Sequence, residues 1–262
     1  MTIADLRKNK NFNKMNTEEY IFGTRAVIEA INNGRNIEKI LIKTGLNNEL
    51  FVQLFALIKE NNIAFQYVPI EKINRITRKN HQGVLALISP LEYASIETLL
   101  PGIYELGKDP LLLILDQITD VRNFGAIARS AECAGVDAII IPDKGMARIG
   151  ADAIKTSAGA LYHLPVCKVK NLEKTIQFLI ESGIHIVAST EKGDKYYSDA
   201  DFNTPLAIVM GSEDTGISPA ILNLANERLK IPIMGKIESL NVSASAALMI
   251  YEAVRQRNYS KT

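Results

Sequence analysis

The 262-residue sequence has no tryptophan, only two cysteines and only three histidines. The cysteines, Cys133 and Cys167, are too few for a disulfide framework, and we interpret both as reduced thiols in the protein core. The histidines, His81, His163 and His185, do not have the spacing of metal ligands, so we expect no metal site. These shortages argue against a disulfide-rich secreted protein and against a metalloenzyme.

The sequence also lacks long apolar segments. No apolar run approaches the roughly 18 residues that a membrane span requires. The first residues are polar and contain no apolar stretch of the kind found in a secretory signal. An apolar fraction of 47% with 23% charged residues is ordinary for a globular chain that buries a core. We therefore expect a cytoplasmic protein that does not enter a membrane.

Several enzyme motifs are missing as well. No G-x-G-x-x-G follows a strand and no G-x-x-x-x-G-K occurs, which argues against dinucleotide and nucleoside-triphosphate binding loops. No serine lies in G-x-S-x-G, the motif of a large hydrolase class. Any cofactor is therefore expected to bind without a glycine-rich phosphate loop.

Positive charge is concentrated in the first third of the chain. Residues 1–89 contain 13 Lys and Arg against 8 Asp and Glu, whereas residues 90–262 contain 17 against 21. Such an excess suits contact with phosphate groups, although a solvated surface would give the same count. The candidates for phosphate contact are Arg25, Arg75, Arg78 and Lys79.

Hydrophobic spacing predicts a small N-terminal α/β domain over residues 20–89, preceded by a basic flexible tail over 1–19. Its expected helices are at 20–33, 49–59 and 70–77, and its expected strands at 37–42, 64–68 and 84–88. Residues 90–109 contain one short helical pattern and two prolines, and a third proline follows at 110, which suits a linker.

From residue 110 to 262 the pattern predicts a second α/β domain. Continuous apolar runs at 111–115, 138–141, 164–169, 184–188 and 206–210 indicate parallel strands covered by helices on both faces. A sixth strand is expected at 229–233, and the expected helices are at 125–134, 151–158, 172–181, 219–225 and 243–257. Ligands of such sheets bind beyond the carboxyl ends of the strands.

Three polar clusters lie where this rule directs attention. They are residues 116–125, which lead into a helix that carries Arg129, residues 211–216 after a strand, and residues 238–243 before the last helix. Each has a plainer interpretation, in which its Asp, Asn or Ser side chains cap helices and its glycines form turns. Three clusters at one sheet edge nevertheless favour a common site.

The clusters resemble the three motifs of the SpoU/TrmH family, in the SPOUT class of RNA methyltransferases. The matching segments are 123–131 (NFGAIARSA), 210–213 (MGSE) and 239–243 (SLNVS). Residues 22–30 and 81–84 (HQGV) resemble the N-terminal substrate-binding domain of that family. The similarity is greatest to the bacterial enzymes that methylate the ribose 2′-hydroxyl of a guanosine in 23S ribosomal RNA.

The resemblance implies a trefoil-knotted parallel sheet with helices on both faces, joined to a small N-terminal α/β RNA-binding domain. It implies S-adenosylmethionine as cofactor, held largely by main-chain groups of loops after the late strands. By position, the cofactor-binding residues are Met210, Gly211, Ile231, Ser239 and Leu240, and the catalytic residues are Asn123, Arg129, Glu213, Asn241 and Ser243.

The resemblance also implies a role for Arg129. Its guanidinium is expected to bind a phosphate beside the target ribose and to stabilise the developing alkoxide, because an arginine with a pKa above about 12 is rarely neutral enough to act as a base. Glu213 and Asn123 are then expected to hold this guanidinium. The sequence departs from the family at Val121, where proline is usual, and at Asp214, where glycine is common.

The last helix predicts an oligomer. Nine of the eleven residues from 244 to 254 are apolar, the exceptions being Ser245 and Glu252. A helix that is apolar nearly all round must be covered on more than one side. The resembled family forms dimers through this region, so we expect a homodimer.

Two alternatives stay open. The substrate could be transfer RNA, although a separate N-terminal domain favours ribosomal RNA. The chain could also be an RNA-binding or ribosome-assembly factor without catalysis, but Arg129, Glu213 and Asn241 are all present.

Overall fold

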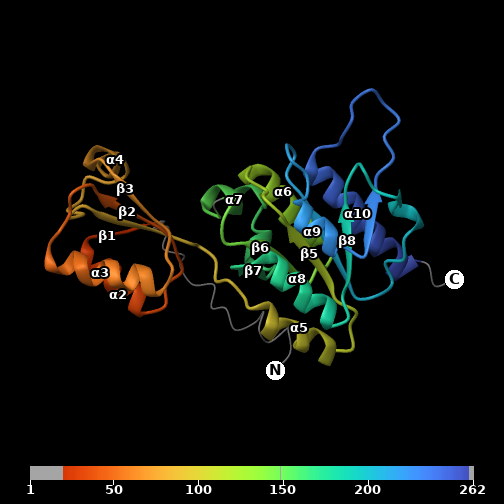
Figure 1. Ribbon diagram of the computed structural model, residues 1–262, viewed down its shortest axis with the longest axis horizontal. Helices are drawn as coiled ribbons and strands as arrows, with labels where there is room; N and C mark the ends of the chain where they lie inside the picture. The colour runs from red at the N-terminus through yellow and green to blue at the C-terminus, as the bar shows by residue number, and fades with distance from the viewer. Residues whose placement is uncertain (1–19, 148, 260–262) are drawn as a thin grey trace. The chain divides into compact units, whose positions relative to one another are not determined.

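A computed structural model describes residues 20–147 and 149–259 (Figure 1). The described chain forms two units, one that ends at Glu92 and one that begins at Tyr93. We call them the N-terminal unit and the C-terminal unit. The basic tail expected over 1–19 lies outside the described residues.

The N-terminal unit contains a four-stranded sheet in the order β1–β4–β2–β3. Its elements are β1 (Tyr20–Phe22), α2 (Thr24–Asn32), β2 (Ile37–Lys43), α3 (Glu49–Glu60), β3 (Phe65–Val68), α4 (Ile70–Ile76) and β4 (Val84–Ile88). Strand β4 is antiparallel to β1 and β2, and β2 is parallel to β3. Val27 of α2 and Leu54 of α3 pack on one face of the sheet, and Ile73 of α4 packs on the other.

The helix expected over 20–33 begins only at Thr24. The first three residues of that range form β1, which pairs with β4 from Tyr20↔Leu87 to Phe22↔Leu85. Gly23 then has a φ of +91°, which no α-helical residue adopts. Aromatic and β-branched side chains favour a strand once a partner strand is present, so pairing with β4 outweighs the helical spacing.

The C-terminal unit contains a seven-stranded sheet in the order β7–β6–β5–β10–β8–β11–β9, in which every pairing is parallel. The strands are β5 (Leu111–Leu115), β6 (Ala138–Pro142), β7 (Val166–Val169), β8 (His185–Ser189), β9 (Lys195–Tyr196), β10 (Leu206–Met210) and β11 (Glu227–Lys230). The α-helices are α5 (Ile96–Glu105), α6 (Val121–Cys133), α7 (Ala151–Thr156), α8 (Leu172–Glu181), α9 (Pro219–Leu224) and α10 (Val242–Tyr259). The expected parallel α/β architecture is confirmed.

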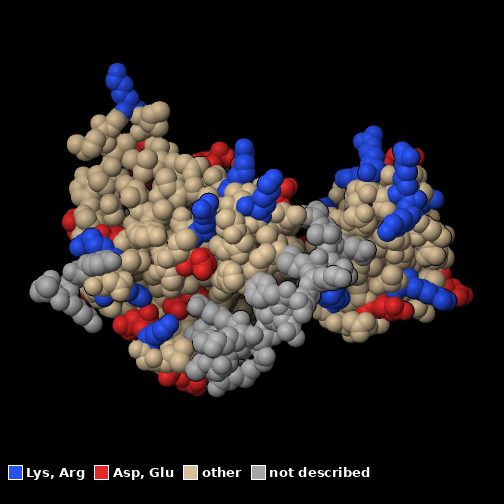
Figure 2. All heavy atoms as spheres, turned by 180° about the vertical axis from the view of Figure 1, so that it is seen from behind, with Lys and Arg blue, Asp and Glu red and all other residues tan. Residues whose placement is uncertain are grey.

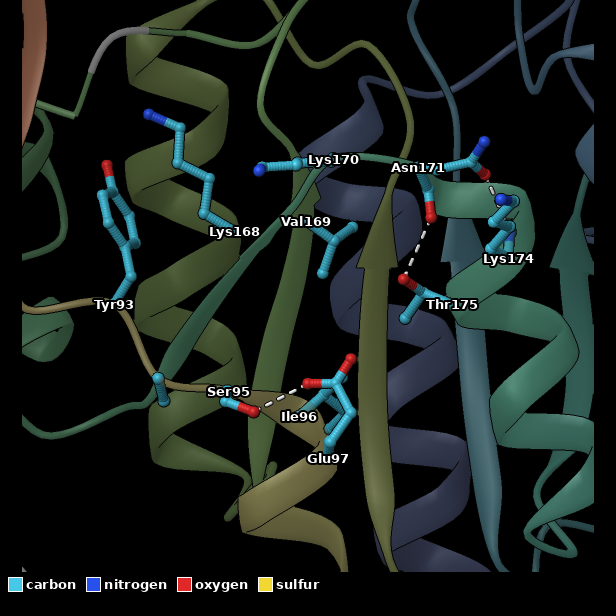
Figure 3. A pocket seen from close by; sticks show the side chains of 11 residues that line it. Tyr93, Ser95, Ile96, Glu97, Lys168, Val169, Lys170, Asn171, Lys174 and Thr175 are labelled. Atoms are coloured by element: carbon cyan, nitrogen blue, oxygen red, sulfur yellow. Dashed lines mark hydrogen bonds between the residues drawn. The ribbon is translucent and has the colours of Figure 1, made fainter. Parts of the chain in front are cut away.

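Helices cover both faces of this sheet. On one face, Leu100 of α5, Ile176 of α8 and Ile221 of α9 share a core with Ile114 of β5 and Val209 of β10. Helices α6 and α10 pack against each other, and Figure 3 shows both behind the sheet, on its other face. The polar loops at the strand ends are therefore carried on a scaffold that is buried on both sides.

The range expected as a linker contains α5. Its Ile96, Leu100 and Ile103 are buried in the core of the C-terminal unit. Just before it, Ala94 forms a parallel bridge with Cys167 at the edge of the sheet. The C-terminal unit therefore begins at Tyr93, and a fragment cut at Pro110 would lose one helix of its core.

Among the differences from the expected elements, two shifted boundaries and one additional strand have a clear physical reason. Helix α6 begins at Val121 rather than 125, because the Asp120 side chain accepts a hydrogen bond from the Arg122 amide at 2.6 Å and caps the helix there. Strand β11 covers Glu227–Lys230 rather than 229–233. Pro232, just beyond it, has no N–H for a further ladder bond. Strand β9 is only two residues long, too short to show a periodic pattern.

One cysteine was placed wrongly. Cys133 is exposed at the end of α6, whereas Cys167 is buried in β7 as expected. Burial raises the pKa of the Cys167 thiol to about 12, so this thiol is unreactive. Among the described residues, no helix is long and apolar enough to cross a membrane, and no group of side chains is suited to hold a metal ion.

Candidate active site

The three polar clusters meet at the carboxyl edge of the parallel sheet. The Asn241 side chain donates hydrogen bonds from Nδ2 to Asn123 Oδ1 at 3.1 Å and to Glu213 Oε1 at 2.6 Å. The Val242 amide donates to the same Glu213 oxygen at 3.3 Å. One amide group thus joins the start of α6, the loop after β10 and the start of α10.

Asn241 also caps α10. Its Oδ1 accepts hydrogen bonds from the Ser243 amide at 2.9 Å and from Ser243 Oγ at 2.5 Å. An asparagine side chain has two donor hydrogens and two acceptor lone pairs, and all four are used here. The side chain of Asn241 therefore caps α10 and also joins the network. Asn241 thus has no side-chain donor or acceptor left for a substrate.

The network leaves hydrogen-bonding atoms of two side chains available. Within the described chain, Glu213 Oε2 and Asn123 Nδ2 have no hydrogen-bond partner. Glu213 is exposed and Asn123 is half-buried. Glu213 lies beside the first turn of an 18-residue helix, where the helix dipole stabilises a negative charge.

The loop after β10 requires glycine at its start. A Cβ atom on Gly211 would lie 2.2 Å from the carbonyl carbon of Gly216. The main chains of Ser212 and Gly216 bond to each other in both directions, at 3.1 and 2.9 Å, which closes the loop. Gly216 has a φ of +68°, whereas Asp214 is not among the residues of positive φ. The backbone therefore has no need of a glycine at 214.

The sequence interpretation missed Asp116 as a site residue. This buried carboxylate directly follows β5, and its Oδ2 accepts a hydrogen bond from the Ser218 amide at 2.8 Å. Its own amide donates to the Met210 carbonyl at 2.8 Å. Asp116 thus ties the end of β5 to both ends of the loop after β10. An acidic residue directly after a fully apolar strand was the available signal.

Gly125 in helix α6 is required by the packing of this helix against α7. A Cβ on Gly125 would lie 2.6 Å from the Thr156 Cβ and 3.1 Å from the Ala153 carbonyl oxygen of α7. No side chain fits there, so Gly125 permits the close crossing of α6 and α7 and thereby fixes the direction of α6. At the start of α6, hydrogen bonds from Arg122 hold the pKa of Asp120 below its ordinary value.

The structure does not bring Arg129 into the network. Arg129 is exposed, and neither Glu213 nor Asn123 forms a hydrogen bond or ion pair with it. Arg129 lies six residues after Asn123 on α6. This spacing places it about 9 Å further along the helix axis and on a different side of the helix. The expectation that Glu213 and Asn123 hold this guanidinium is therefore wrong for the chain by itself.

The proposed cofactor residues lie on two loops. Met210 and Gly211 are buried where β10 ends, and Ile231 directly follows β11. Ser239 and Leu240 lie on the exposed loop that leads to Asn241, and Leu240 keeps 42% of its surface exposed. The Asn241–Glu213 bond connects this loop to that of Gly211; no hydrogen bond among the described residues connects Ile231 to either.

The parallel α/β sheet, with this network at its carboxyl edge, agrees with the SPOUT class of methyltransferases that the sequence motifs resemble. Sequence comparison is more specific. The model of the SpoU rRNA Methylase family matches residues 110–251, and that of RNA 2′-O ribose methyltransferase substrate binding matches residues 20–94. The chain belongs to the SpoU rRNA methylase family.

Relatives match over nearly the whole chain. YacO of Bacillus subtilis (strain 168), named for the TrmH family of tRNA/rRNA methyltransferases, is 34% identical over 92% of this chain and 96% of its own. A TrmH-family protein of Staphylococcus saprophyticus is 38% identical over 92% and 97%. The fold is similar to the crystal structure of the SpoU methyltransferase AviRb from Streptomyces viridochromogenes in complex with AdoMet. The match covers 97% of this chain and 96% of the AviRb chain, with a TM-score of 0.59 and 23% identity.

The chain is accordingly an RNA 2′-O-ribose methyltransferase of the SpoU/TrmH family, with a substrate-binding N-terminal region. The cofactor of this family is S-adenosylmethionine.

Proposed function

We propose that this chain methylates the ribose 2′-hydroxyl of a guanosine in 23S ribosomal RNA, in the cytoplasm and as a homodimer with a knotted C-terminal domain. The observation that carries the proposal is the network in which Asn241 joins Glu213 and Asn123. These residues come from three separate motifs, and a factor that only binds RNA has no need to keep them together. A separate substrate-binding unit favours a large RNA over transfer RNA.

We propose that S-adenosylmethionine binds at the loops after β10 and β11, at Met210, Gly211, Ile231, Ser239 and Leu240. When bound, it supplies a methyl group on a positively charged sulfur, and no phosphate has to be held. The loop residues fit this group because they offer main chain and uncovered apolar side chains. Met234 and Ile237 on the same loop are 96% and 76% exposed, so their apolar surface is open to a ligand.

The chain's own residues have two tasks, to orient the 2′-hydroxyl and to manage its proton. We propose that Glu213 Oε2 accepts a hydrogen bond from the hydroxyl while Asn241 holds the carboxylate in place. We propose that Arg129 binds a phosphate of the RNA and stabilises negative charge that develops on the ribose oxygen. The exposed position of Arg129 supports contact with a ligand from outside the chain.

The N-terminal unit supports RNA binding by its charge. Arg25, Arg75, Arg78 and Lys79 are all exposed, and Figure 2 shows Lys and Arg side chains gathered at the end of this unit that carries α4. The following turn is held by His81, whose Nδ1 accepts the Gly83 amide at 3.1 Å while Nε2 lies 2.8 Å from Asn74 Oδ1. The imidazole therefore carries its proton on Nε2, and the HQG segment serves to shape this turn.

Helix α10 supports a homodimer. Leu248 and Tyr251 are three residues apart and 40% and 48% exposed. Met249 between them is fully buried against the chain's own core. The apolar side that is left for a partner therefore contains Leu248 and Tyr251 and does not contain Met249.

The proposal is tested by transfer of a labelled methyl group from S-adenosylmethionine to 23S ribosomal RNA transcripts and, in parallel, to transfer RNA. A methylated 2′-oxygen cannot attack the neighbouring phosphodiester, so resistance to alkaline cleavage identifies the nucleotide. We expect label in 23S RNA at a guanosine. Label in transfer RNA alone would overturn the ribosomal substrate, and tight RNA binding without any label would indicate a non-catalytic factor.

A further inference from the structure

A second basic feature lies in the C-terminal unit, apart from the motif residues. A hollow of about 520 Å³ opens between the start of α5, the end of β7 and the start of α8. Tyr93 lines one side, Lys168 and Lys170 line it at the end of β7, and Lys174 lines it from α8 (Figure 3). We call these four residues the lysine hollow.

The lining of the hollow contains more lysine than carboxylate side chains. Lys168 Nζ lies 4.9 Å from the centroid of the Tyr93 ring, a cation–π contact. Lys170 and Lys174 are exposed, and among the described residues neither forms an ion pair. The hollow contains one carboxylate, Glu97, whose pKa is lowered by a hydrogen bond from Ser95 Oγ at 2.7 Å. The ammonium groups of Lys170 and Lys174 thus have no ion-pair partner among the described residues, and both would attract an anionic partner.

The lysine hollow lies at the same edge of the sheet as the active-site network. Lys168 is the last residue but one of β7, and Lys170 directly follows the strand. In the sheet, β7, β6, β5 and β10 are consecutive and parallel, so their carboxyl ends point the same way. With neighbouring strands about 4.8 Å apart, the end of β7 is about 10 Å from that of β5 and about 14 Å from that of β10. A few nucleotides span this distance.

We propose that the lysine hollow binds the sugar–phosphate backbone of the substrate RNA a few nucleotides from the target ribose. Lysine ammonium groups contact phosphates as point charges and do not read sequence, so the hollow would position the strand. Lys170 and Lys174 line the hollow from the end of β7 and from α8, so a phosphate in the hollow could be contacted from two elements (Figure 3). This inference rests on the proposed RNA methyltransferase function.

The test compares Lys170→Glu with Lys108→Glu in the full chain. Both lysines are exposed and both substitutions change the net charge equally, but Lys108 precedes β5 and lies at the opposite edge of the sheet. Fluorescence anisotropy gives the Kd of labelled 23S ribosomal RNA fragments and of transfer RNA at several salt concentrations. Steady-state methylation gives KM and kcat for the RNA.

For Lys170→Glu we expect a Kd about tenfold higher and a slope of log K against log salt reduced by about 1. The double variant Lys170→Ala/Lys174→Ala should reduce the slope by about 1.4 to 2, and Lys170→Arg/Lys174→Arg should restore it. KM for RNA should rise while kcat and cofactor affinity stay unchanged, as for a contact made equally in ground and transition states.

Equal Kd and equal slopes for Lys170→Glu and Lys108→Glu would overturn the proposal. The binding assay does not depend on methyl transfer, so a chain that binds RNA through the hollow but transfers no methyl group would contradict only the proposed function. Thermal unfolding checks that each variant is folded. If Lys170→Glu unfolds, Lys170→Ala/Lys174→Ala, which introduces no new charge, decides the outcome by the same criterion.

Discussion

Helix α10 crosses the parallel sheet, and its two ends use their polar side chains differently. At the carboxyl edge, exposed Asn241 bonds to side chains of two other loops, Glu213 and Asn123. At the amino edge, Arg257 donates to main-chain carbonyl oxygens before β5 and β10, namely those of Asp109, Pro110, Phe202 and Thr204, at 2.6 to 3.2 Å. At the carboxyl edge a side chain of α10 therefore bonds to other side chains, and at the amino edge a side chain of α10 bonds to main-chain carbonyl groups.

From this difference we expect the carboxyl-edge end of α10 to serve activity and the amino-edge end to serve stability. Side-chain contacts at an exposed edge can be lost without unfolding the core, whereas carbonyl groups that lose a charged donor at a half-buried position are left unsatisfied. Two arginines show the same division. Arg129 is exposed and has no hydrogen bond or ion pair to the described residues, while Arg257 is held by two incoming segments of chain.

The largest effect on rate is expected from Arg129→Ala. Loss of one electrostatic contact to a developing oxyanion typically lowers kcat by a factor of about 10² to 10³. Because Arg129 has no hydrogen bond or ion pair to the described residues, its loss should not destabilise the fold. Cofactor affinity and the unfolding midpoint should be unchanged. Methyl-transfer rates at saturating RNA, with Arg122→Ala as a control on the same helix, measure this. A variant as active as the parent would remove Arg129 from the mechanism.

The largest effect on stability is expected from Arg257→Ala. The substitution removes hydrogen bonds from a charged donor and leaves their acceptors unpaired, which should lower the free energy of unfolding by about 3 kcal/mol. Urea denaturation measures this, with Arg255→Ala as the control because Arg255 is exposed and pairs only within α10. The control should cost about 1 kcal/mol or less. An equal loss of unfolding free energy in Arg257→Ala and Arg255→Ala would mean that the hydrogen bonds from Arg257 to the four carbonyl groups add little stability.

Asn241 allows the cap and the network to be separated. Serine is a good N-cap but is too short to bridge two other side chains, so Asn241→Ser should keep α10 capped within a few tenths of a kcal/mol and lower kcat by about tenfold or more. Asn241→Ala should lower kcat as well and additionally cost about 1 kcal/mol of stability. Paired unfolding and rate measurements distinguish the roles. Full activity in Asn241→Ser would show that the network is not needed.

Much of the fold could be predicted because it follows from burial. The run of five apolar residues in β5 has one explanation, a strand covered on both faces, and the same holds for β10. Strand β1 could not be predicted from its own residues, because Tyr20 to Phe22 become a strand only by pairing with β4, more than sixty residues away. Helix α5 was expected, but no local feature showed that its apolar face packs under a distant sheet.

The site was predictable to a similar degree. The residue types and their order along the chain placed Asn123, Glu213 and Asn241 at one sheet edge, and the structure joins them. How each amide or carboxylate is used depends on geometry that spacing does not contain. Capping by Asn241 was one of two interpretations, but its simultaneous use in the cap and in the network was not foreseen, and neither was the tie from Asp116 to Ser218. The position of Arg129 follows from the pitch of α6 and could have been noticed from its spacing to Asn123.

A smaller effect is expected on assembly. Tyr251→Glu places a charge on the exposed side of α10 without disturbing the core, so the chain should stay folded while any dimer dissociates at least tenfold more readily. Light scattering across a concentration series measures this, with Asn258→Glu, exposed near the end of the same helix, as the control. Met249 is unsuitable, because a charge at that buried position would unfold the chain. A parent protein that is monomeric at all concentrations would refute the dimer.

The smallest effect concerns the pH dependence of the amino-edge end of α10. Glu252 is buried and accepts hydrogen bonds from Arg255 Nε and Nη2 at 2.9 and 2.7 Å and from Gln256 Nε2 at 2.7 Å. Gln256 in turn bonds to the main chain of Ala200 and Phe202, which links Glu252 to the segment before β10. The hydrogen bonds from Arg255 hold the pKa of Glu252 below its ordinary value.

A carboxyl group whose pKa is lowered by folding stabilises the folded state when it is ionised. Its contribution is therefore complete above the ordinary glutamate pKa of about 4.3 and is lost as the pH falls through the lower pKa of the folded state. Glu252→Gln should be less stable than the parent at pH 7, and the difference should shrink below about pH 4. Urea denaturation at both pH values measures it, with Glu181→Gln at an exposed position of α8 as the control. The difference in unfolding free energy between Glu252→Gln and the parent could instead stay constant with pH. The charge of Glu252 would then not stabilise this end of α10, and the hydrogen bond from Gln256, which a glutamine at 252 can also accept, would be sufficient.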